Sequence, residues 1–150
     1  MSHVLDSVDR QIIRVLQRDG RTSHVETARQ VGVSEATVRK RLEQLLSTRV
    51  IRITAMPNAS RVGFSTIAFM TLSMDLASVG RIAEEIARFP EVRTVHLTSG
   101  GSELIVEAWF MSSEELLHFM TQHLGGIAGI KRMAISHVMR TIKDGSGWIL

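Results

Sequence analysis

Hydrophobic residues in the first third of the chain recur every three or four positions, the spacing of a helix with one buried face. The pattern predicts helices over residues 6–18, 24–31 and 35–47. Asp6 stands where an N-cap side chain accepts a hydrogen bond from the first turn, and Gly20 stands where a helix ends. We therefore expect a small bundle of three helices near the N-terminus.

The second and third of these helices meet at a tight corner. Ala28 is small enough for the third helix to pass close by, and Gly32 tolerates the positive φ that a sharp corner needs. Ser34 can cap the third helix, while Val38 faces back into the crossing. This is the spacing of a helix-turn-helix, whose second helix fits the major groove of DNA.

The third helix has an apolar side and a basic side. Its apolar stripe consists of Val38, Leu42 and Leu45. The other side and its flanks carry three consecutive cations, Arg39, Lys40 and Arg41. A short basic run is also typical of a solvated face on an ordinary helical hairpin, so the charges alone leave both interpretations open. The corner and the charges together favour DNA binding.

The candidate DNA contacts fall into two groups. Phosphates are expected to be neutralised by cationic side chains, namely Arg21, Arg39, Lys40, Arg41 and Arg49. Base edges are expected to be read from the first half of the helix that Ser34 caps, by Glu35, Ala36, Thr37 and Lys40. Two such helices in a dimer would enter successive major grooves about 34 Å apart.

Beyond residue 49 the chain alternates between strand-like and helix-like segments. A β-branched run at 50–55 predicts a strand beside the bundle, as in a winged helix-turn-helix, and Pro57 breaks it. Further strands are predicted over residues 64–74, 92–98, 104–110 and 130–142, and helices over residues 78–89 and 113–124. The order βαββαβ is that of a ferredoxin-like sheet with two helices on one face. The expected fold class is α+β.

These elements divide the chain into four parts. They are a helix-turn-helix domain (1–49), a strand and hinge linker (50–62), a ferredoxin-like domain (63–143) and a tail (144–150) that contains Trp148. Methionine and leucine side chains are left over for the outer face of so small a sheet. We expect a dimer to hide that face.

Composition narrows the class of protein. The net charge of +3 is unevenly spread, because residues 1–61 carry +5 and residues 62–150 carry −2. Only the N-terminal part, residues 1–61, is therefore expected to bind a polyanion. The absence of cysteine excludes disulfides and thiolate metal sites, and no apolar run is long enough for a membrane span. We expect a cytoplasmic protein with no membrane association, no cofactor and no metal.

Several short motifs occur in order along the chain. They are Leu5-Asp6-x-x-Asp9, Leu16-Gln17-x-Asp19-Gly20-Arg21, Ser34-x-x-x-Val38-x-x-Arg41-x-x-x-Leu45, Val62-Gly63, Phe89-Pro90-Glu91-Val92, Gly129-Ile130 and Thr141-Ile142-Lys143. In this combination the chain resembles the Lrp/AsnC family, the feast/famine regulators. The resemblance implies a transcription regulator that binds double-stranded DNA. It also implies a C-terminal domain that binds amino acids and assembles dimers, then octamers or other higher oligomers.

The resemblance further implies an effector site at the turn between the second and third strands of that domain. The family has T-G-x-x-D there, and this chain has Ser99, Gly100, Gly101, Ser102 and Glu103. An exposed backbone turn with a carboxylate could hold the carboxylate and ammonium of an amino acid, although a plain tight turn explains it as well. A second departure is Arg49, where the family has glycine. It either adopts a left-handed conformation or changes the helix cap.

Two other functions compete with an amino-acid-responsive regulator. Siroheme decarboxylases are similar in overall fold, but this chain has no clustered His-Arg motif and no tyrosine, and it keeps a basic recognition helix. A ligand-independent architectural protein would bend DNA without an effector. Haem-like absorbance would identify the enzyme, and a thermal shift with amino acids would identify the ligand-gated regulator.

Overall fold

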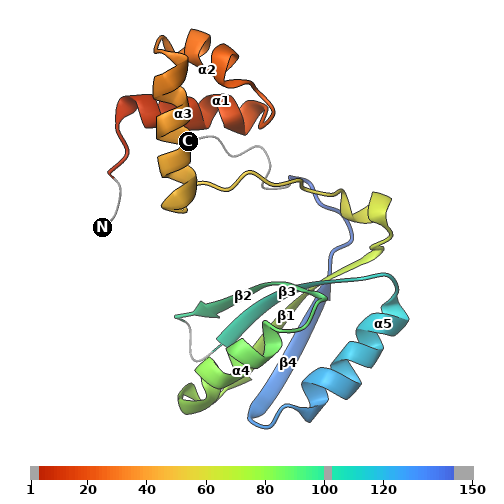
Figure 1. Ribbon diagram of the computed structural model, residues 1–150. Coiled ribbons are helices and arrows are strands. Elements are labelled where there is room, and N and C mark those ends of the chain that lie inside the picture. Colours follow the sequence, from red (N-terminus) through yellow and green to blue (C-terminus); the bar gives the residue numbers. More distant parts are fainter. Residues whose placement is uncertain (1–3, 100–102, 144–150) are drawn as a thin grey trace. The chain divides into compact units, whose positions relative to one another are not determined.

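The computed structural model describes residues 4–99 and 103–143, shown as a coloured ribbon in Figure 1. These residues form two compact units. One includes residues 4–56 and the other comprises residues 57–142. The predicted tail with Trp148 lies outside the described residues. Among the described helices, none combines the length and the apolar composition needed to cross a membrane.

The first unit is a bundle of three helices, α1 (Ser7–Arg18), α2 (His24–Val31) and α3 (Glu35–Ser47). This confirms the three predicted helices to within a residue. The side chain of Asp6 accepts a hydrogen bond from the Asp9 backbone N–H at 2.8 Å, and Asp9 accepts one from the Asp6 backbone N–H at 3.2 Å. This reciprocal cap fixes the start of α1. Buried apolar residues from all three helices form the core, namely Ile12, Ile13, Ala28, Val38 and Leu45.

The strand predicted over residues 50–55 is wrong. This segment follows α3 without regular secondary structure, and the described residues of the first unit contain no strand. The β-branched residues favour an extended backbone, but a strand also needs a neighbour to take up its backbone hydrogen bonds. Ile51 packs against the core of the bundle instead. The winged arrangement is therefore not seen in the described part of this unit.

The second unit contains an antiparallel sheet of four strands in the order β2-β3-β1-β4. The strands are β1 (Thr66–Met74), β2 (Val92–Thr98), β3 (Glu103–Phe110) and β4 (Ile130–His137). The helices are α4 (Val79–Ile86) and α5 (Ser113–His118), with a π-helical turn at Phe119–His123 and 3-10 turns at Ala59–Val62, Leu76–Ser78 and Leu124–Gly126. The predicted βαββαβ order is confirmed.

Some elements are shorter than predicted. The last strand was expected to reach residue 142, but it ends at His137, which pairs with Ala68 of β1. Among the described strands, β4 lies at the edge of the sheet and pairs with β1, so its pairing stops close to where β1 begins. The second predicted helix of this unit also changes character, because the α-helix ends at His118 and continues as a π-helical turn.

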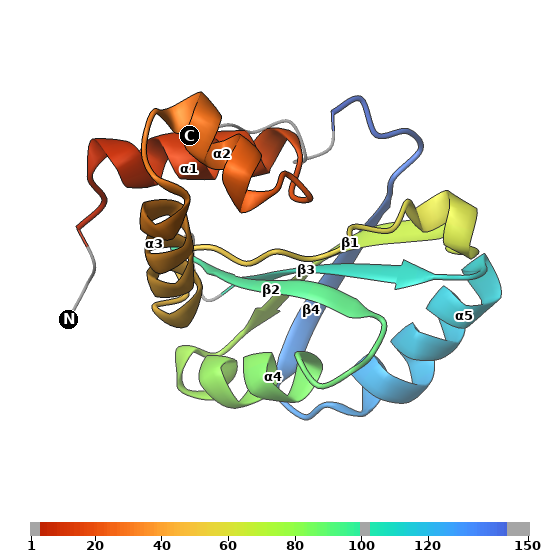
Figure 2. The ribbon, with the colours of Figure 1, turned by 45° about the horizontal axis from the view of Figure 1, so that its top comes forward.

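The two faces of the sheet have different surroundings. Figures 1 and 2 show α4 and α5 on the same side of the sheet, and there Ala68, Met70 and Leu72 of β1 are fully buried. We call the other side the open face. Methionine and leucine residues were expected on it, but strand alternation directs those of β1 and β3 into the core. The open face instead presents aromatic and polar side chains, including Phe69 at 43% exposure.

Candidate nucleic-acid interface and effector pocket

The corner before α3 forms as the sequence predicts. Gly32 ends α2 with a φ of 78°, and its backbone N–H donates to the Ala28 carbonyl oxygen at 2.9 Å. Ser34 caps α3, because its hydroxyl oxygen accepts a hydrogen bond from the Thr37 backbone N–H at 3.1 Å. These local bonds fix the direction in which α3 leaves the turn.

α3 buries one side and exposes the other. Val38, Leu42 and Leu45 are buried against the bundle, as the apolar stripe predicts. Ala36 and Lys40 are exposed on the other side. The Thr37 hydroxyl lies 2.8 Å from the hydroxyl of Ser34, so the cap also orients this side chain.

The three consecutive cations of α3 have different partners. Arg39 forms an ion pair with Glu35 at 2.6 Å, one turn earlier on the same helix. Arg41 reaches α1, with one nitrogen 2.9 Å from Asp6 and another 3.6 Å from Asp9. In the described part of the chain, the Lys40 ammonium has no ion pair or hydrogen bond. Lys40 is therefore the cation of this run most available to a phosphate.

Arg41 joins α3 to the capped end of α1. The Asp9 side chain is fully buried, and the Arg41 side chain is 33% exposed. The hydrogen bond from the Asp9 backbone N–H, followed by the nearby Arg41 charge, lowers the pKa of Asp6 below its ordinary value. The assignment of Arg41 as a phosphate contact remains a prediction, but within the protein Arg41 already has two carboxylate partners.

The other two predicted phosphate contacts lie at the ends of helices. Arg21 is exposed just before α2, 3.7 Å from Asp19. Arg49 is exposed just after α3 and has a φ of 57°. This is the left-handed conformation, one of the two outcomes expected for a residue that stands where the family has glycine. The backbone N–H groups of Arg49 and Val50 donate to carbonyls of the last turn, at 3.0 and 2.9 Å. The cap of α3 thus forms without glycine.

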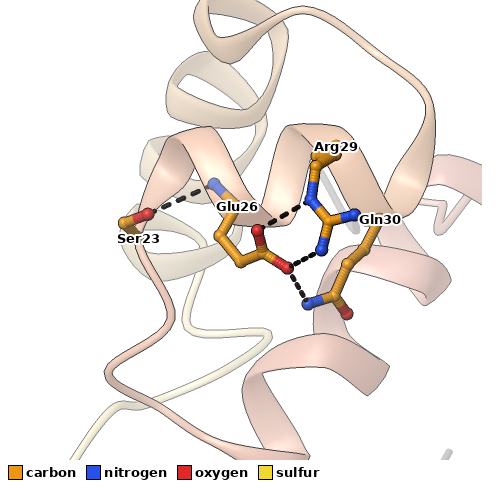
Figure 3. A network of polar contacts seen from close by, with 4 residues as sticks. All are labelled: Ser23, Glu26, Arg29 and Gln30. Carbon is orange, nitrogen blue, oxygen red and sulfur yellow. Dashed lines mark hydrogen bonds and ion pairs between the residues drawn. The ribbon is translucent and has the colours of Figure 1, made fainter.

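α2 carries a polar network that sequence reasoning did not identify (Figure 3). Ser23 caps the helix, and the Glu26 carboxylate accepts two hydrogen bonds from Arg29, at 2.9 and 2.6 Å, and one from Gln30 at 2.7 Å. The bonds from Arg29, and then that from Gln30, lower the pKa of Glu26 to about 2. The i, i+3 and i, i+4 spacing of these residues was the available signal.

The predicted effector turn is only partly described. Ser99 is exposed at the end of β2 and Glu103 begins β3, while Gly100, Gly101 and Ser102 lie outside the described residues. Glu103 lines a pocket at the sheet, together with Thr71, Ser73, Arg132, Met133 and Ala134. The sequence did not single out these other residues, because their proximity depends on the pairing of three strands. The only available signal was strand alternation, which indicates which residues of one strand share a face of the sheet.

A second pocket lies next to α5 and bears on the decarboxylase alternative. It is lined by Glu91, Phe110, Glu114, Glu115, His118, Phe119 and His123. The rings of His118 and His123 are 5.8 Å apart, so two of the histidines of this unit do come together. The described residues bring no arginine to this pocket, which therefore does not form a His-Arg group.

Both units match known protein families. Residues 5–46 match the AsnC-type helix-turn-helix domain, and residues 67–148 match the Lrp/AsnC ligand binding domain. The chain belongs to the Lrp/AsnC family. This Lrp/AsnC protein is therefore a transcriptional regulator with a DNA-binding domain and a ligand-binding domain.

Similar proteins agree with this assignment. An uncharacterised helix-turn-helix regulator of Pyrococcus horikoshii is 34% identical over 140 residues, covering 93% of this chain and 88% of that protein. The regulator FL11 of Pyrococcus abyssi is 30% identical over 141 residues, covering 93% of each chain. Both are named as regulators, which favours a regulator over an enzyme.

Solved structures share the fold of this Lrp/AsnC regulator. A transcriptional regulator of Neisseria meningitidis, solved as a complex with L-Met, has a TM-score of 0.84 and 27% identity, with 94% of each chain covered. AsnC of Escherichia coli has a TM-score of 0.86 at 20% identity, with 95% of this chain and 97% of that chain covered. The likeness to AsnC concerns the fold alone.

Proposed function

We propose that this Lrp/AsnC regulator binds DNA as a homodimer through α3 of each copy, and that an amino acid bound in the second unit alters its assembly on DNA. The strongest support is the exposed side of α3. It begins at a capped N-terminus and carries Lys40 without an ion partner in the described residues. A rigid helix with a free cation suits the major groove.

Base recognition is assigned to the first half of α3. Ala36 and Thr37 carry methyl groups that can contact thymine, and Lys40 can donate to guanine or to a phosphate. Glu35 has the weaker role, because its carboxylate is engaged by Arg39. Phosphate contacts are assigned to Arg21, Arg39 and Arg49, whose side chains are exposed.

The open face of the sheet is the proposed dimer contact. Phe69 is 43% exposed there, and the rings of Phe64 and Trp109 pack edge to face at 5.7 Å. Arg93 covers the Trp109 ring at 4.7 Å. A second copy placed against this aromatic surface would remove it from water, and dimers of this kind can associate further into octamers.

An amino acid is the proposed effector. The second unit matches a ligand binding domain, and the Neisseria meningitidis relative was solved with L-Met. Ser99 and Glu103 flank the turn at which we place the effector. Such a ligand changes DNA occupancy only if it binds one assembly more tightly than another. The size of that difference in affinity limits the size of the change.

DNA binding is tested with K40A on a duplex that the wild-type protein selects from a random-sequence library. We expect weaker binding and a smaller dependence of log Kobs on log salt. The slope should fall by about 0.9 for each phosphate that is no longer neutralised, and so by about 1.8 for a dimer. The matched control is R88A, which removes an exposed cation from the second unit. If K40A keeps the wild-type affinity and salt slope, Lys40 does not contact DNA.

The effector is tested by thermal shift with the twenty common L-amino acids. We expect one or a few of them to raise the melting temperature of the intact protein, because a ligand that binds only the folded state stabilises it. The same amino acids should change the pattern of gel-shifted complexes. If none raises the melting temperature while DNA binding persists, the ligand-independent architectural protein becomes the better description.

A further inference from the structure

α1 carries three exposed arginines along one side. Arg10, Arg14 and Arg18 follow each other at intervals of four residues, and all three are exposed. Four residues advance a helix by about 6 Å and slightly more than one turn, so the three side chains form one row about 12 Å long. We call these three residues the arginine row. They lie outside the set of DNA contacts assigned to α3 and its flanks.

The arginine row is locally unfavourable. Like charges four residues apart on a helix destabilise it. In the sequence, the positions three and four residues before and after Arg14 hold glutamine and arginine, and none holds an acid. The other two helices of this unit are arranged differently, because Arg29 pairs with Glu26 and Arg39 pairs with the glutamate one turn before it. A row of like charges that weakens its own helix favours a role in binding.

Two members of the row have no partner in the described chain. The side chains of Arg10 and Arg18 make no ion pair or hydrogen bond there. The exposed acids nearest to them along the chain have other partners. Asp6 caps α1 and pairs with an arginine of α3, and Asp19 lies 3.7 Å from Arg21. Both guanidinium groups are therefore available to an anion outside the chain.

The arginine row faces away from α3. Ile12 and Ile13 of α1 belong to the core that also contains Val38 and Leu45 of α3. At 3.6 residues per turn, Arg14 in the middle of the row lies about 150° around the helix axis from the direction midway between the two isoleucines. The exposed side of α3 faces away from the same core. The two basic surfaces therefore lie on different sides of the helical unit.

We propose that the arginine row binds the phosphate backbone of a second DNA segment while α3 occupies the major groove of the first. This inference rests on the proposed binding of DNA through α3. Guanidinium groups form paired hydrogen bonds with phosphates, and a row about 12 Å long meets several of them, because each strand presents one for about every 3.4 Å of duplex axis. DNA held at α3 also raises the local concentration of its own flanks. Backbone contacts carry no sequence information, so the second segment can have any sequence.

The test loads the intact protein with a saturating amount of the selected duplex, trimmed to about 20 base pairs so that it covers two successive major grooves. A fluorescent duplex of unrelated sequence is then titrated in, and its anisotropy is measured at several salt concentrations. We expect the loaded wild-type protein to bind this second duplex. R10A/R18A should weaken that binding at least about 10-fold and lower its salt slope by about 0.9 for each lost phosphate contact, while binding of the short duplex is unchanged.

Two variants serve as controls. R88A/R140A removes the same charge from exposed positions of the second unit and should bind both duplexes as wild type does. K40A, loaded with the short duplex at a higher concentration, should still bind the second duplex. The melting temperature of R10A/R18A should not fall, because the substitutions remove like charges from α1 and alanine is the strongest helix former.

The outcomes separate this proposal from the proposed function. If the loaded wild-type protein does not bind the second duplex, or if R10A/R18A binds it as tightly, the row is not a contact for a second segment, and binding through α3 stands. If R10A/R18A loses the short duplex to the same degree, the row belongs to the α3 interface and the proposal is wrong. If K40A abolishes binding of the second duplex, that duplex lies on α3 of another subunit, which also overturns it. A wild-type protein that binds neither duplex would refute the proposed function and this inference with it.

Discussion

Three arginines of the helical unit and two charged residues on the open face of the sheet differ in whether they have a partner within the chain. In the helical unit, Arg29, Arg39 and Arg41 each form an ion pair within the chain. On the open face of the sheet, Glu103 and Arg132 have no such partner among the described residues. A paired charge holds helices in place, and a competing phosphate must share or displace its partner. An unpaired charge beside a pocket has no ion pair that a ligand must share or displace, so it is better suited to binding a ligand.

The largest expected effect comes from removing Arg41. The Asp9 side chain is fully buried, so R41A leaves a buried carboxylate without this counter-ion. We expect the free energy of unfolding of the helical unit to fall by about 1–3 kcal/mol, the range for an unsatisfied buried polar group. Chemical denaturation followed by circular dichroism measures the change.

R132A is the matched comparison, because it removes an exposed arginine without a partner in the described part of the sheet unit. Its effect on the free energy of unfolding should stay within about 0.5 kcal/mol. R41A should also keep the wild-type salt slope of DNA binding if the ion pairs with Asp6 and Asp9 keep Arg41 from contacting phosphate, and a smaller slope would mean that Arg41 is a phosphate contact as the sequence predicts. Equal destabilisation by R41A and R132A would remove the distinction between paired and unpaired charges.

Arg49 gives a smaller effect of the opposite sign. A residue with a side chain at a φ of 57° is less favourable than glycine by about 1–2 kcal/mol. R49G relieves this strain but also makes the unfolded chain more flexible, so we expect a net gain of up to about 1 kcal/mol. Thermal unfolding measures it, with R52G, outside any helix, as the control.

The same variant shows whether the strain serves binding. If Arg49 contacts a phosphate, R49G should bind DNA more weakly and with a smaller salt slope, even though it is more stable. A variant that is more stable and binds DNA as well as wild type would mean that Arg49 has no role at the interface.

How much the sequence predicts depends on how far apart the interacting residues lie. Gly32 and Ser34 act on neighbours within four residues, so the corner and the cap of α3 were predictable. The segment 50–55 has strand-like residues, but whether a strand forms depends on a partner elsewhere in the chain. Ser73 and Arg132 meet only through strand register, which no local pattern reports. Of the residues that line the pocket at the sheet, the sequence therefore singled out Glu103 alone.

The smallest expected effect concerns the exposed network of α2, in which the titratable carboxylate of Glu26 pairs with Arg29. Glu26 has its pKa lowered to about 2 from an ordinary value of 4.5, mainly by Arg29. A lowered pKa means that the stabilisation is fully present above about pH 4.5 and is lost as the pH falls toward 2. Because the pair is exposed, the effect on stability is small. We expect E26Q to have a slightly lower melting temperature than wild type at pH 7, and the difference to shrink as the pH is lowered through this range.

Glu43 of α3 provides the control, since its exposed carboxylate has no ion pair or hydrogen bond within the described chain. A difference between E26Q and wild type that stays constant from pH 7 to the acid end would show that the Glu26 network does not stabilise α2 through its charge.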